Sequence, residues 1–347
     1  MADKLRWGIL GNATIGRKCV MPAIRKSTNG KIRALGTRRP DAAGEIAKQN
    51  RIERVYGDYE SVLRDPEVEA VYIPLPNHLH RPWTLKALAA GKHVLCEKPL
   101  GCSAEQAREM AAAARGSGLV LMEALMYRFH PRTRRVKGLI GEGAVGTPRL
   151  VRAAFCFSMA PELLESGDNC RLQPKMGGGA LLDVGSYAVS VARWFLEAEP
   201  AAVQAQAVYR GKTEVDIHLV GTLRFPGGAL ATVEASFCAG LQQSYTVVGS
   251  GGAVELPHDA FIPWEKDAAV MVRGKDEETG KTLVVPGADE YRLMVEHFAD
   301  RVRTGKAPTV SVEDSIGNLV ALDAMAEAAR TGRTVFISQE DPSSRKP

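Results

Sequence analysis

The sequence predicts an α/β protein in which a doubly wound parallel sheet is followed by an α+β domain with a large, open, mostly antiparallel sheet. Up to residue 124, short segments that are apolar on both faces alternate with helical segments, which is typical of a parallel sheet covered by helices on both sides. Beyond residue 124, β-rich segments follow one another and the helices are grouped apart from them. The predicted domains are residues 1–124 and residues 125–347.

Local patterns predict the individual elements. Apolar runs predict strands of the first domain at residues 5–10, 32–37, 70–74, 93–96 and 119–122. Helices are expected up to residue 27, after Asp41 as N-cap, from residue 81 to 90 with Gly91 closing the helix, and from residue 104 to 115. In the second domain we expect strands at residues 149–158, 202–209, 215–225 and 229–237, with a hairpin turn at residues 226–228. Its helices are expected at residues 179–197, 291–303 and 312–330.

The composition excludes several classes of protein. Of the 347 residues, 45% are hydrophobic and 24% are charged, as in ordinary globular proteins. No run approaches the roughly 18 apolar residues of a membrane-spanning helix, and the N-terminus lacks the apolar stretch of a secretory signal, so we expect a cytoplasmic protein. The net charge of +5 is spread along the chain, and nucleic acid is not an expected partner. The cysteines and histidines lack metal-ligand spacing, so no metal is expected.

The second domain also predicts a partner. Its large sheet is open, and an open sheet with one apolar face must be covered. We therefore expect a homodimer or homotetramer that assembles through this sheet.

A glycine turn follows the first predicted strand and opens a helix. Its sequence, Gly11-Asn12-Ala13-Thr14-Ile15-Gly16, matches the pattern GxGxxG with alanine at the middle glycine. Small residues there allow a tight turn and a close approach of the pyrophosphate, which backbone N–H groups at the helix N-terminus bind. The motif predicts a Rossmann domain that binds NAD or NADP through residues 11–15.

The end of the second predicted strand favours NADP. A site that prefers NAD usually has an acidic residue there for the ribose hydroxyls. This chain has Thr37-Arg38-Arg39 instead, and a hydroxyl with two guanidinium groups suits a 2′-phosphate through charge-assisted hydrogen bonds. The alternative is a pair of solvated arginines in a loop.

Lys98 and Tyr187 are the candidate catalytic pair. Lys98 lies in Glu97-Lys98-Pro99 directly after a strand of the first domain, where parallel sheets form their ligand crevice. Tyr187 ends the glycine-rich run 177–187, in which Asp183 would share its helix face. A tyrosine general base must lose a proton that is normally held to a pKa of about 10, and a nearby ammonium group stabilises the phenolate. The alternative is a buried structural tyrosine that hydrogen-bonds to Asp183.

These segments together resemble the glucose–fructose oxidoreductase / inositol dehydrogenase (Gfo/Idh/MocA) family over essentially the whole chain. The matching segments are the glycine turn, residues 71–80, residues 90–100, Met122-Glu123-Ala124 and residues 177–187. Many members of the family have histidine where this chain has Tyr187. The tyrosine resembles the branch that includes glucose–fructose oxidoreductase, D-xylose dehydrogenases and dihydrodiol dehydrogenases.

The resemblance implies roles for particular residues. It implies that Lys98 and Tyr187 are catalytic and that Asp183 binds or orients the substrate. Further residues are expected to line the ribose–nicotinamide part of the cofactor, with Glu97 close by: Pro74, Leu75, Asn77 and His80. The alternative for His80 is a residue that starts a helix. Glu123 and Arg171 are expected to reach the cofactor and Arg128 the substrate, with ordinary contacts between the domains as the alternative.

The expected function is NADP-dependent oxidation of a sugar or similar polyol. Tyr187, assisted by Lys98, would remove the hydroxyl proton while hydride passes to the nicotinamide. Our first choice is the oxidation of an aldose such as xylose or glucose at C1 to a lactone. Alternatives with the same residues are an NADPH-dependent reductase of a keto-sugar, either anhydrofructose or a nucleotide-linked keto-deoxysugar, and a trans-dihydrodiol dehydrogenase. A non-catalytic NADP-binding regulator would have no need of Lys98, Asp183 and Tyr187.

Overall fold

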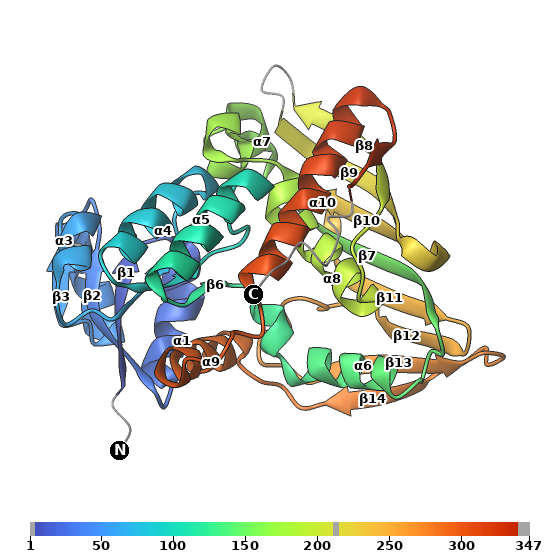
Figure 1. The fold of residues 1–347 in the computed structure, drawn as a ribbon, viewed down its shortest axis with the longest axis horizontal. Coiled ribbons are helices and arrows are strands. Elements are labelled where there is room, and N and C mark those ends of the chain that lie inside the picture. The colour runs from blue at the N-terminus through green and yellow to red at the C-terminus, as the bar shows by residue number, and fades with distance from the viewer. Residues whose placement is uncertain (1–3, 211–214, 339–347) are drawn as a thin grey trace. The chain divides into compact units, whose positions relative to one another are not determined.

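Two β-sheets, one in each of two units, organise the computed structural model, which describes residues 4–210 and 215–338 (Figure 1). Unit 1 comprises the described part of Met1–His130 together with Ala288–Ile316, and unit 2 comprises the described parts of Pro131–Gly287 and Gly317–Pro347. Residues 1–3, which begin the segment on which the expected cytoplasmic location rests, lie outside the described residues.

Unit 1 contains a six-stranded sheet in the order β3-β2-β1-β4-β5-β6, in which every neighbouring pair is parallel. Its strands are β1 (Leu5–Leu10), β2 (Gly30–Gly36), β3 (Arg54–Tyr56), β4 (Ala70–Ile73), β5 (His93–Cys96) and β6 (Leu121–Glu123). The strand order reverses between β1 and β4, and doubly wound sheets bind ligands at the carboxyl ends of the strands beside such a reversal. The predicted doubly wound parallel sheet is confirmed.

Helical segments connect these strands. They are η1 (Gly16–Val20), α1 (Met21–Lys26), η2 (Pro40–Ala43), α2 (Gly44–Asn50), α3 (Tyr59–Arg64), η3 (Asn77–Leu79), α4 (His80–Ala89), α5 (Ala104–Ser117) and η4 (Met126–Phe129). The predicted cap at Asp41 is wrong, because Asp41 lies inside η2 and the N-cap residue Arg39 makes no side-chain cap hydrogen bond. Pro40 begins η2, since the fixed φ of proline suits the first position of a helical turn.

Helix α9 (Glu290–Thr304) belongs to unit 1, although the sequence analysis assigns its residues to the second domain. It lies beside α1 (Figure 1). The ring of Phe298 on α9 packs 5.0 Å from the ring of Trp7 on β1, and both side chains are fully buried. The amphipathic pattern of α9 predicts a helix with one buried face, but it does not say which sheet that face meets. The observed division of the chain therefore differs from the predicted contiguous domains.

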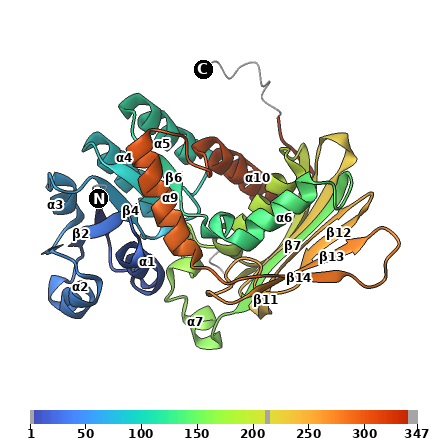
Figure 2. The same cartoon turned by 90° about the horizontal axis from the view of Figure 1, so that it is seen from below.

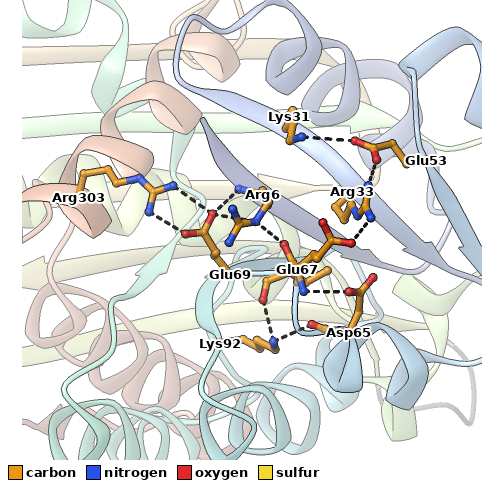
Figure 3. Close-up of polar contacts among 10 residues, drawn as sticks. Arg6, Lys31, Arg33, Glu53, Asp65, Glu67, Glu69, Lys92 and Arg303 are labelled. Atoms are coloured by element: carbon orange, nitrogen blue, oxygen red, sulfur yellow. Dashed lines mark hydrogen bonds and ion pairs between the residues drawn. The ribbon is translucent and has the colours of Figure 1, made fainter. Parts of the chain in front are cut away.

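Ion pairs also attach α9 to the sheet of unit 1. Figure 3 shows Glu69, which precedes β4, between Arg303 of α9 and Arg6 of β1. Arg303 Nη1 lies 2.7 Å from Glu69 Oε1, and the backbone N–H of Arg6 donates to Glu69 Oε2 at 2.9 Å. Nearby, the buried ammonium group of Lys92 donates to the carbonyl oxygens of Asp65 and Val68 (Figure 3). These contacts lie at the amino ends of β1 and β4, so the opposite, carboxyl ends stay available for a ligand.

Unit 2 contains a nine-stranded sheet in the order β14-β13-β12-β11-β7-β10-β9-β8-β15. Its strands are β7 (Pro148–Ser158), β8 (Ala202–Arg210), β9 (Val215–Arg224), β10 (Leu230–Ser236), β11 (Cys238–Gly249), β12 (Gly252–Leu256), β13 (Ala268–Gly274), β14 (Lys281–Val285) and β15 (Val335–Phe336). All neighbours are antiparallel except β7 and β10. The predicted mostly antiparallel sheet is confirmed, and the strands from β11 onward extend it beyond the predicted set.

Helices pack against the sheet of unit 2. The helical segments of this part of the chain are α6 (Pro131–Gly141), α7 (Pro161–Ser166), η5 (Cys170–Leu172), η6 (Pro174–Met176), η7 (Leu181–Gly185), α8 (Ser186–Leu196), the turn η9 (Pro226–Gly228) and α10 (Val312–Thr331), which continues from unit 1 into unit 2. Helix α8 packs on β7, β10 and β11, and α6 runs along the same sheet beside β13 (Figure 2). Within residues 4–210 and 215–338, no helix combines the length and the hydropathy that crossing a bilayer requires.

Replacing Phe298 tests the assignment of α9 to unit 1. Phe298→Ala removes a fully buried ring that packs on Trp7, so we expect the free energy of unfolding to fall by about 3–5 kcal/mol in a urea titration. Phe336→Ala, at a ring that is 72% exposed, is the control and should change it by no more than about 0.5 kcal/mol. Equal stabilities of the two variants would contradict the packing of α9 on β1.

Candidate functional site

A cavity of about 490 Å³ lies at the carboxyl ends of β1, β2 and β4 in unit 1. Three segments that are far apart in the sequence line it: the glycine turn after β1, the end of β2 with η2 and α2, and the loop after β4. Its lining residues are Gly11, Asn12, Ala13, Arg17, Thr37, Arg38, Arg39, Ala42, Ile46, Tyr59, Pro74, Leu75 and Pro76. The structure therefore brings most of the predicted adenosine and pyrophosphate residues to one cavity.

The glycine turn shapes the floor of this cavity. Gly11 has a φ of +111°, a backbone conformation that favours glycine, and a Cβ atom there would also lie 2.8 Å from Leu75 Cδ2, so the end of that side chain would have to move. The backbone N–H of Gly11 donates to the carbonyl oxygen of Gly36 at 2.9 Å and so joins the turn to the end of β2. The buried Asn12 Oδ1 has no hydrogen-bond partner among the described residues, which leaves an acceptor for a bound ligand. These features fit a dinucleotide.

The cavity is strongly cationic at the end of β2. Arg38 and Arg39 are exposed there, and Thr37 is buried with its Oγ1 accepting the backbone N–H of Arg39 at 3.2 Å. Arg17, which the sequence analysis missed, adds a third guanidinium group from η1, and its Nη2 donates to Thr14 Oγ1 at 3.3 Å. The position of Arg17 directly after the glycine motif was the available signal. Thr14 and Ile15 are not among the lining residues.

The loop that carries Lys98 follows β5 and is fixed by buried side chains. Glu97 Oε1 accepts a hydrogen bond of 2.6 Å from the hydroxyl of Tyr72. The backbone N–H of Leu100 donates to Glu123 Oε1 at 3.0 Å, and His80 Nδ1 lies 2.8 Å from the carbonyl oxygen of Pro99. Lys98 itself is partly exposed, as is Asn77 at the start of η3, and neither lines the cavity.

His80 and Glu123, whose contacts with the cofactor stay a prediction, are buried against the loop that carries Lys98. His80 is fully buried, and its other ring nitrogen, Nε2, lies 2.7 Å from the carbonyl oxygen of Leu75. Burial lowers the pKa of His80 to about 4, so the ring is neutral at pH 7 and donates to one of these two oxygens at a time. Glu123 is 1% exposed, and burial raises its pKa to about 7. Both residues hold backbone near Lys98 and offer no surface to a ligand.

Arg128 is likewise buried rather than open to a substrate. Its Nε donates to Tyr127 Oη at 2.9 Å, and its Nη2 pairs with Asp314 Oδ2 at 3.2 Å, within unit 1. Leaving either charge of such a buried pair without the other is costly. These contacts hold Arg128 in place within unit 1, and its contact with substrate stays a prediction.

In unit 2, Tyr187 lies at the start of α8 in an aromatic wall. Its side chain is buried, and its ring centroid is 5.3 Å from those of Phe155 on β7 and Phe261 in the loop after β12. Asp183 precedes it in the π-helical turn η7. Arg171 Nε donates to Asp183 Oδ2 at 2.6 Å, and the carboxylate of Asp183 raises the pKa of Arg171. The predicted residues Asp183 and Arg171 thus pair with each other at the beginning of the helix that carries Tyr187.

One residue near this helix escaped the sequence analysis. The backbone N–H of Leu181 donates to Asp216 Oδ2 at 2.7 Å, and burial raises the pKa of Asp216 to about 6. Asp216 lies 35 residues further along the chain, on β9. In residues 4–210 and 215–338, no group of three or more histidine, cysteine, aspartate or glutamate side chains is placed to hold a metal ion.

Comparisons with known proteins define the class of protein. Residues 5–125 match the model of the oxidoreductase family with an NAD-binding Rossmann fold, and residues 133–255 match the GFO/IDH/MocA C-terminal domain. The chain belongs to the Gfo/Idh/MocA family of oxidoreductases. The predicted resemblance, the predicted enzymatic class and the prediction of a nicotinamide dinucleotide as cofactor are confirmed.

Relatives of this chain act on sugars. It is 38% identical to D-xylose 1-dehydrogenase (NADP(+)) 2 of Haloferax volcanii, over 96% of this chain and 100% of that one. The 3-ketoreductase KijD10 of Actinomadura kijaniata, solved with NADP and TDP-benzene, superposes with a TM-score of 0.87 at 32% identity, over 94% of this chain and 98% of that one. The aldose–aldose oxidoreductase of Caulobacter crescentus, solved with glycerol, gives 0.86 at 29% identity, over 96% and 100% of the two chains.

Proposed function

We propose that this chain is an NADP-dependent aldose dehydrogenase that oxidises C1 of a sugar such as xylose or glucose to a lactone. The observation that carries the proposal is Tyr187, held in an aromatic wall directly after the Asp183–Arg171 pair. A tyrosine at this position suits a general base, and the 38% identity to a D-xylose 1-dehydrogenase over nearly the whole chain supports an aldose as substrate.

The proposed mechanism assigns one task to each residue. The bound nicotinamide supplies the acceptor for hydride. Tyr187 takes the proton of the C1 hydroxyl, and the ammonium group of Lys98 stabilises the resulting phenolate. Asp183 accepts hydrogen bonds from sugar hydroxyls, and the hydrogen bond from Arg171 orients its carboxylate. The rings of Phe155 and Phe261 keep water from one side of Tyr187.

The proposal includes NADP as the cofactor. At the end of β2, where a carboxylate would select NAD, the cavity presents Thr37, Arg38 and Arg39, and Arg17 also lines it. Guanidinium groups bind phosphate through forked, charge-assisted hydrogen bonds.

Keto-sugar reduction is the second candidate. The similarity to KijD10, a 3-ketoreductase, favours it, and the reaction uses the same residues in reverse, with Tyr187 giving its proton to the carbonyl oxygen. The aromatic wall of Phe155 and Phe261 also suits a dihydrodiol.

Nicotinamide absorbance tests the proposed function. Mixed with NADP⁺ and single aldoses, the protein should reduce the cofactor with xylose or glucose. No reduction of NADP⁺ with any aldose, together with oxidation of NADPH by a keto-sugar such as 1,5-anhydrofructose, would favour the reductase. Turnover of a trans-dihydrodiol alone would favour the third function.

Tyr187→Phe tests the assigned base within the same assay. The variant retains the ring packing but loses the group that accepts the proton, so kcat should fall by about 10²–10⁴-fold. NADPH affinity, measured by fluorescence, should stay within about twofold of the wild type, because the cofactor cavity is in unit 1. Wild-type turnover in the variant would remove Tyr187 from the mechanism.

The double variant Arg38→Ala/Arg39→Ala tests the choice of cofactor. Because charge-assisted hydrogen bonds contribute about 1.5–3 kcal/mol each, the Kd for NADPH should rise at least about tenfold, while the Kd for NADH stays nearly unchanged. Arg134→Ala, at an exposed arginine of α6, is the control. An equal loss of both cofactors would show that the two arginines do not recognise the 2′-phosphate.

The sheet of unit 2 supports the proposal of a homodimer or homotetramer. Neighbouring strands β8, β9 and β10 expose apolar side chains, with Val208 54%, Val220 43% and Leu230 49% accessible. The strand register places these side chains on one face of the sheet. A second copy of the same sheet is the self-complementary partner that closed symmetry favours for such a face.

Light scattering during gel filtration tests this assembly. The wild type should have the mass of a dimer or tetramer, and Val220→Lys should lower the mass because it places a charge in the proposed interface. Leu163→Lys makes the same change at an exposed position of α7 and should leave the mass unaltered. A monomeric wild type would refute the proposed assembly.

A further inference from the structure

A β-bulge aims Asp216 at the helix that carries Tyr187. Along β8 and β9, Val208 pairs with His218, but the next residue, Tyr209, pairs with Asp216, so Ile217 is an extra residue on β9. Strict alternation would place Asp216 on the face of Val220, which is exposed. The extra residue turns it to the face of Tyr209, where the helical segments pack. Bulges commonly redirect a side chain beside an active site.

The carboxylate of Asp216 meets the first turn of η7. Its Oδ2 accepts the backbone N–H of Leu181 at 2.7 Å, and the N–H groups of Ala180 and of Asp216 itself also donate to the carboxylate. These N–H groups are among those that a helix start leaves without partners inside the helix. We call the Asp216 carboxylate with these hydrogen bonds the anchor. Because Asp183 and Tyr187 follow in the same continuous helical stretch, the anchor fixes the position of the backbone that carries both side chains.

The glycine run before η7 is matched to this anchor. Gly179 has a φ of +120°, a backbone conformation that residues with a Cβ atom rarely adopt. A Cβ atom built on it would also clash with Asp216 Oδ1. The Asp216 carboxylate can therefore accept the N–H groups at the start of η7 only because residue 179 has no side chain.

The anchor is a buried charge held mainly by backbone. The surrounding elements carry titratable or charged side chains, among them Tyr209, which pairs with Asp216 across β8, with Arg210 next to it, and His218 further along β9. Others are Asp183 in η7, paired with Arg171, and Arg330 of α10, which acts on Tyr209. Burial raises the pKa of Asp216 from 3.8 to about 6. A raised pKa of a folded carboxyl group means that its contribution to stability is lost as the pH rises through about 6. Retaining a carboxylate here therefore costs folding free energy, which indicates a role other than stability.

We propose that Asp216 is a positioning residue of the reaction: through the N–H groups of Ala180 and Leu181 it fixes the helical turn that places Asp183 and Tyr187. The proposal rests on the proposed roles of Asp183 and Tyr187. The ionised carboxylate is the stronger acceptor, so turnover should decline as the pH falls through about 6.

Hydrogen exchange tests the anchor independently of activity. In the full-length Asp216→Asn variant, the amides of residues 180–185 should exchange at least about tenfold faster than in the wild type, because a neutral amide replaces the anchoring carboxylate. Asp276→Asn makes the same change of charge at an exposed position between β13 and β14 and should leave this peptide unchanged. Unaltered exchange in Asp216→Asn would overturn the proposal, whether or not the protein oxidises aldoses.

Kinetics test the consequence for the reaction. At pH 8, kcat of Asp216→Asn should fall about tenfold with the Kd of NADPH unchanged, and the decline of kcat near pH 6 should disappear from its pH profile. Gly179→Ala, which displaces the same carboxylate, should reproduce the loss of kcat and thus serves if Asp216→Asn folds poorly. Faster exchange with wild-type kcat and pH profile would overturn the positioning role. A wild type without turnover on any sugar would refute the proposed function, while exchange still decides the anchor.

Discussion

Buried polar side chains that bind backbone groups are the interaction on which the site depends. Lys98 lies in the loop after β5, and Asp183 and Tyr187 follow the start of a helical stretch. At both places backbone groups lack partners within their own strand or helix. In unit 1, Glu123 and His80 contact the backbone of Leu100 and Pro99, on the loop of Lys98. In unit 2, Asp216 receives the N–H of Leu181 ahead of Tyr187. Such anchors restrict a loop more tightly than apolar contacts, because each hydrogen bond fixes a direction as well as a distance.

The anchors explain why several side chains of the characteristic motifs are hidden. A motif residue can be required because it touches a ligand or because it holds a residue that does, and spacing alone does not separate these roles. His80 and Arg128 are buried, and the hydrogen bonds of His80 to the backbone of Leu75 and Pro99 and of Arg128 to Tyr127 and Asp314 hold other parts of unit 1 in place. The residues of the cavity remain open to a ligand in unit 1, above all Asn12 with its unpartnered oxygen and the arginines at the end of β2.

The charges of unit 1 are divided between the two ends of its parallel sheet. At the amino ends, Glu69 forms ion pairs with both Arg6 and Arg303 and so attaches α9 (Figure 3). At the carboxyl ends, Arg17, Arg38 and Arg39 line a cavity. A cluster of cations around a concavity attracts an anion far more strongly than the net charge of +5 would suggest. Charged side chains therefore attach α9 to the sheet at its amino end and form a cationic, anion-binding cavity at its carboxyl end.

The sequence by itself determined the parts of this protein that depend on neighbours along the chain. Apolar runs and turn residues were enough to predict most strands of the parallel sheet, the glycine turn at residues 11–16 and the helix before Tyr187, because hydrophobic period and glycine placement are local properties. Tertiary structure alone decided the packing partner of α9, the burial of His80 and Glu123, and the orientation of Asp216. Each of these depends on a residue distant in the chain. Phe298 packs on Trp7, the backbone N–H of Leu100 donates to Glu123, and the extra residue Ile217 in β9 turns Asp216 toward Leu181. Local sequence patterns do not predict such pairings, since only the folded chain brings the two partners together.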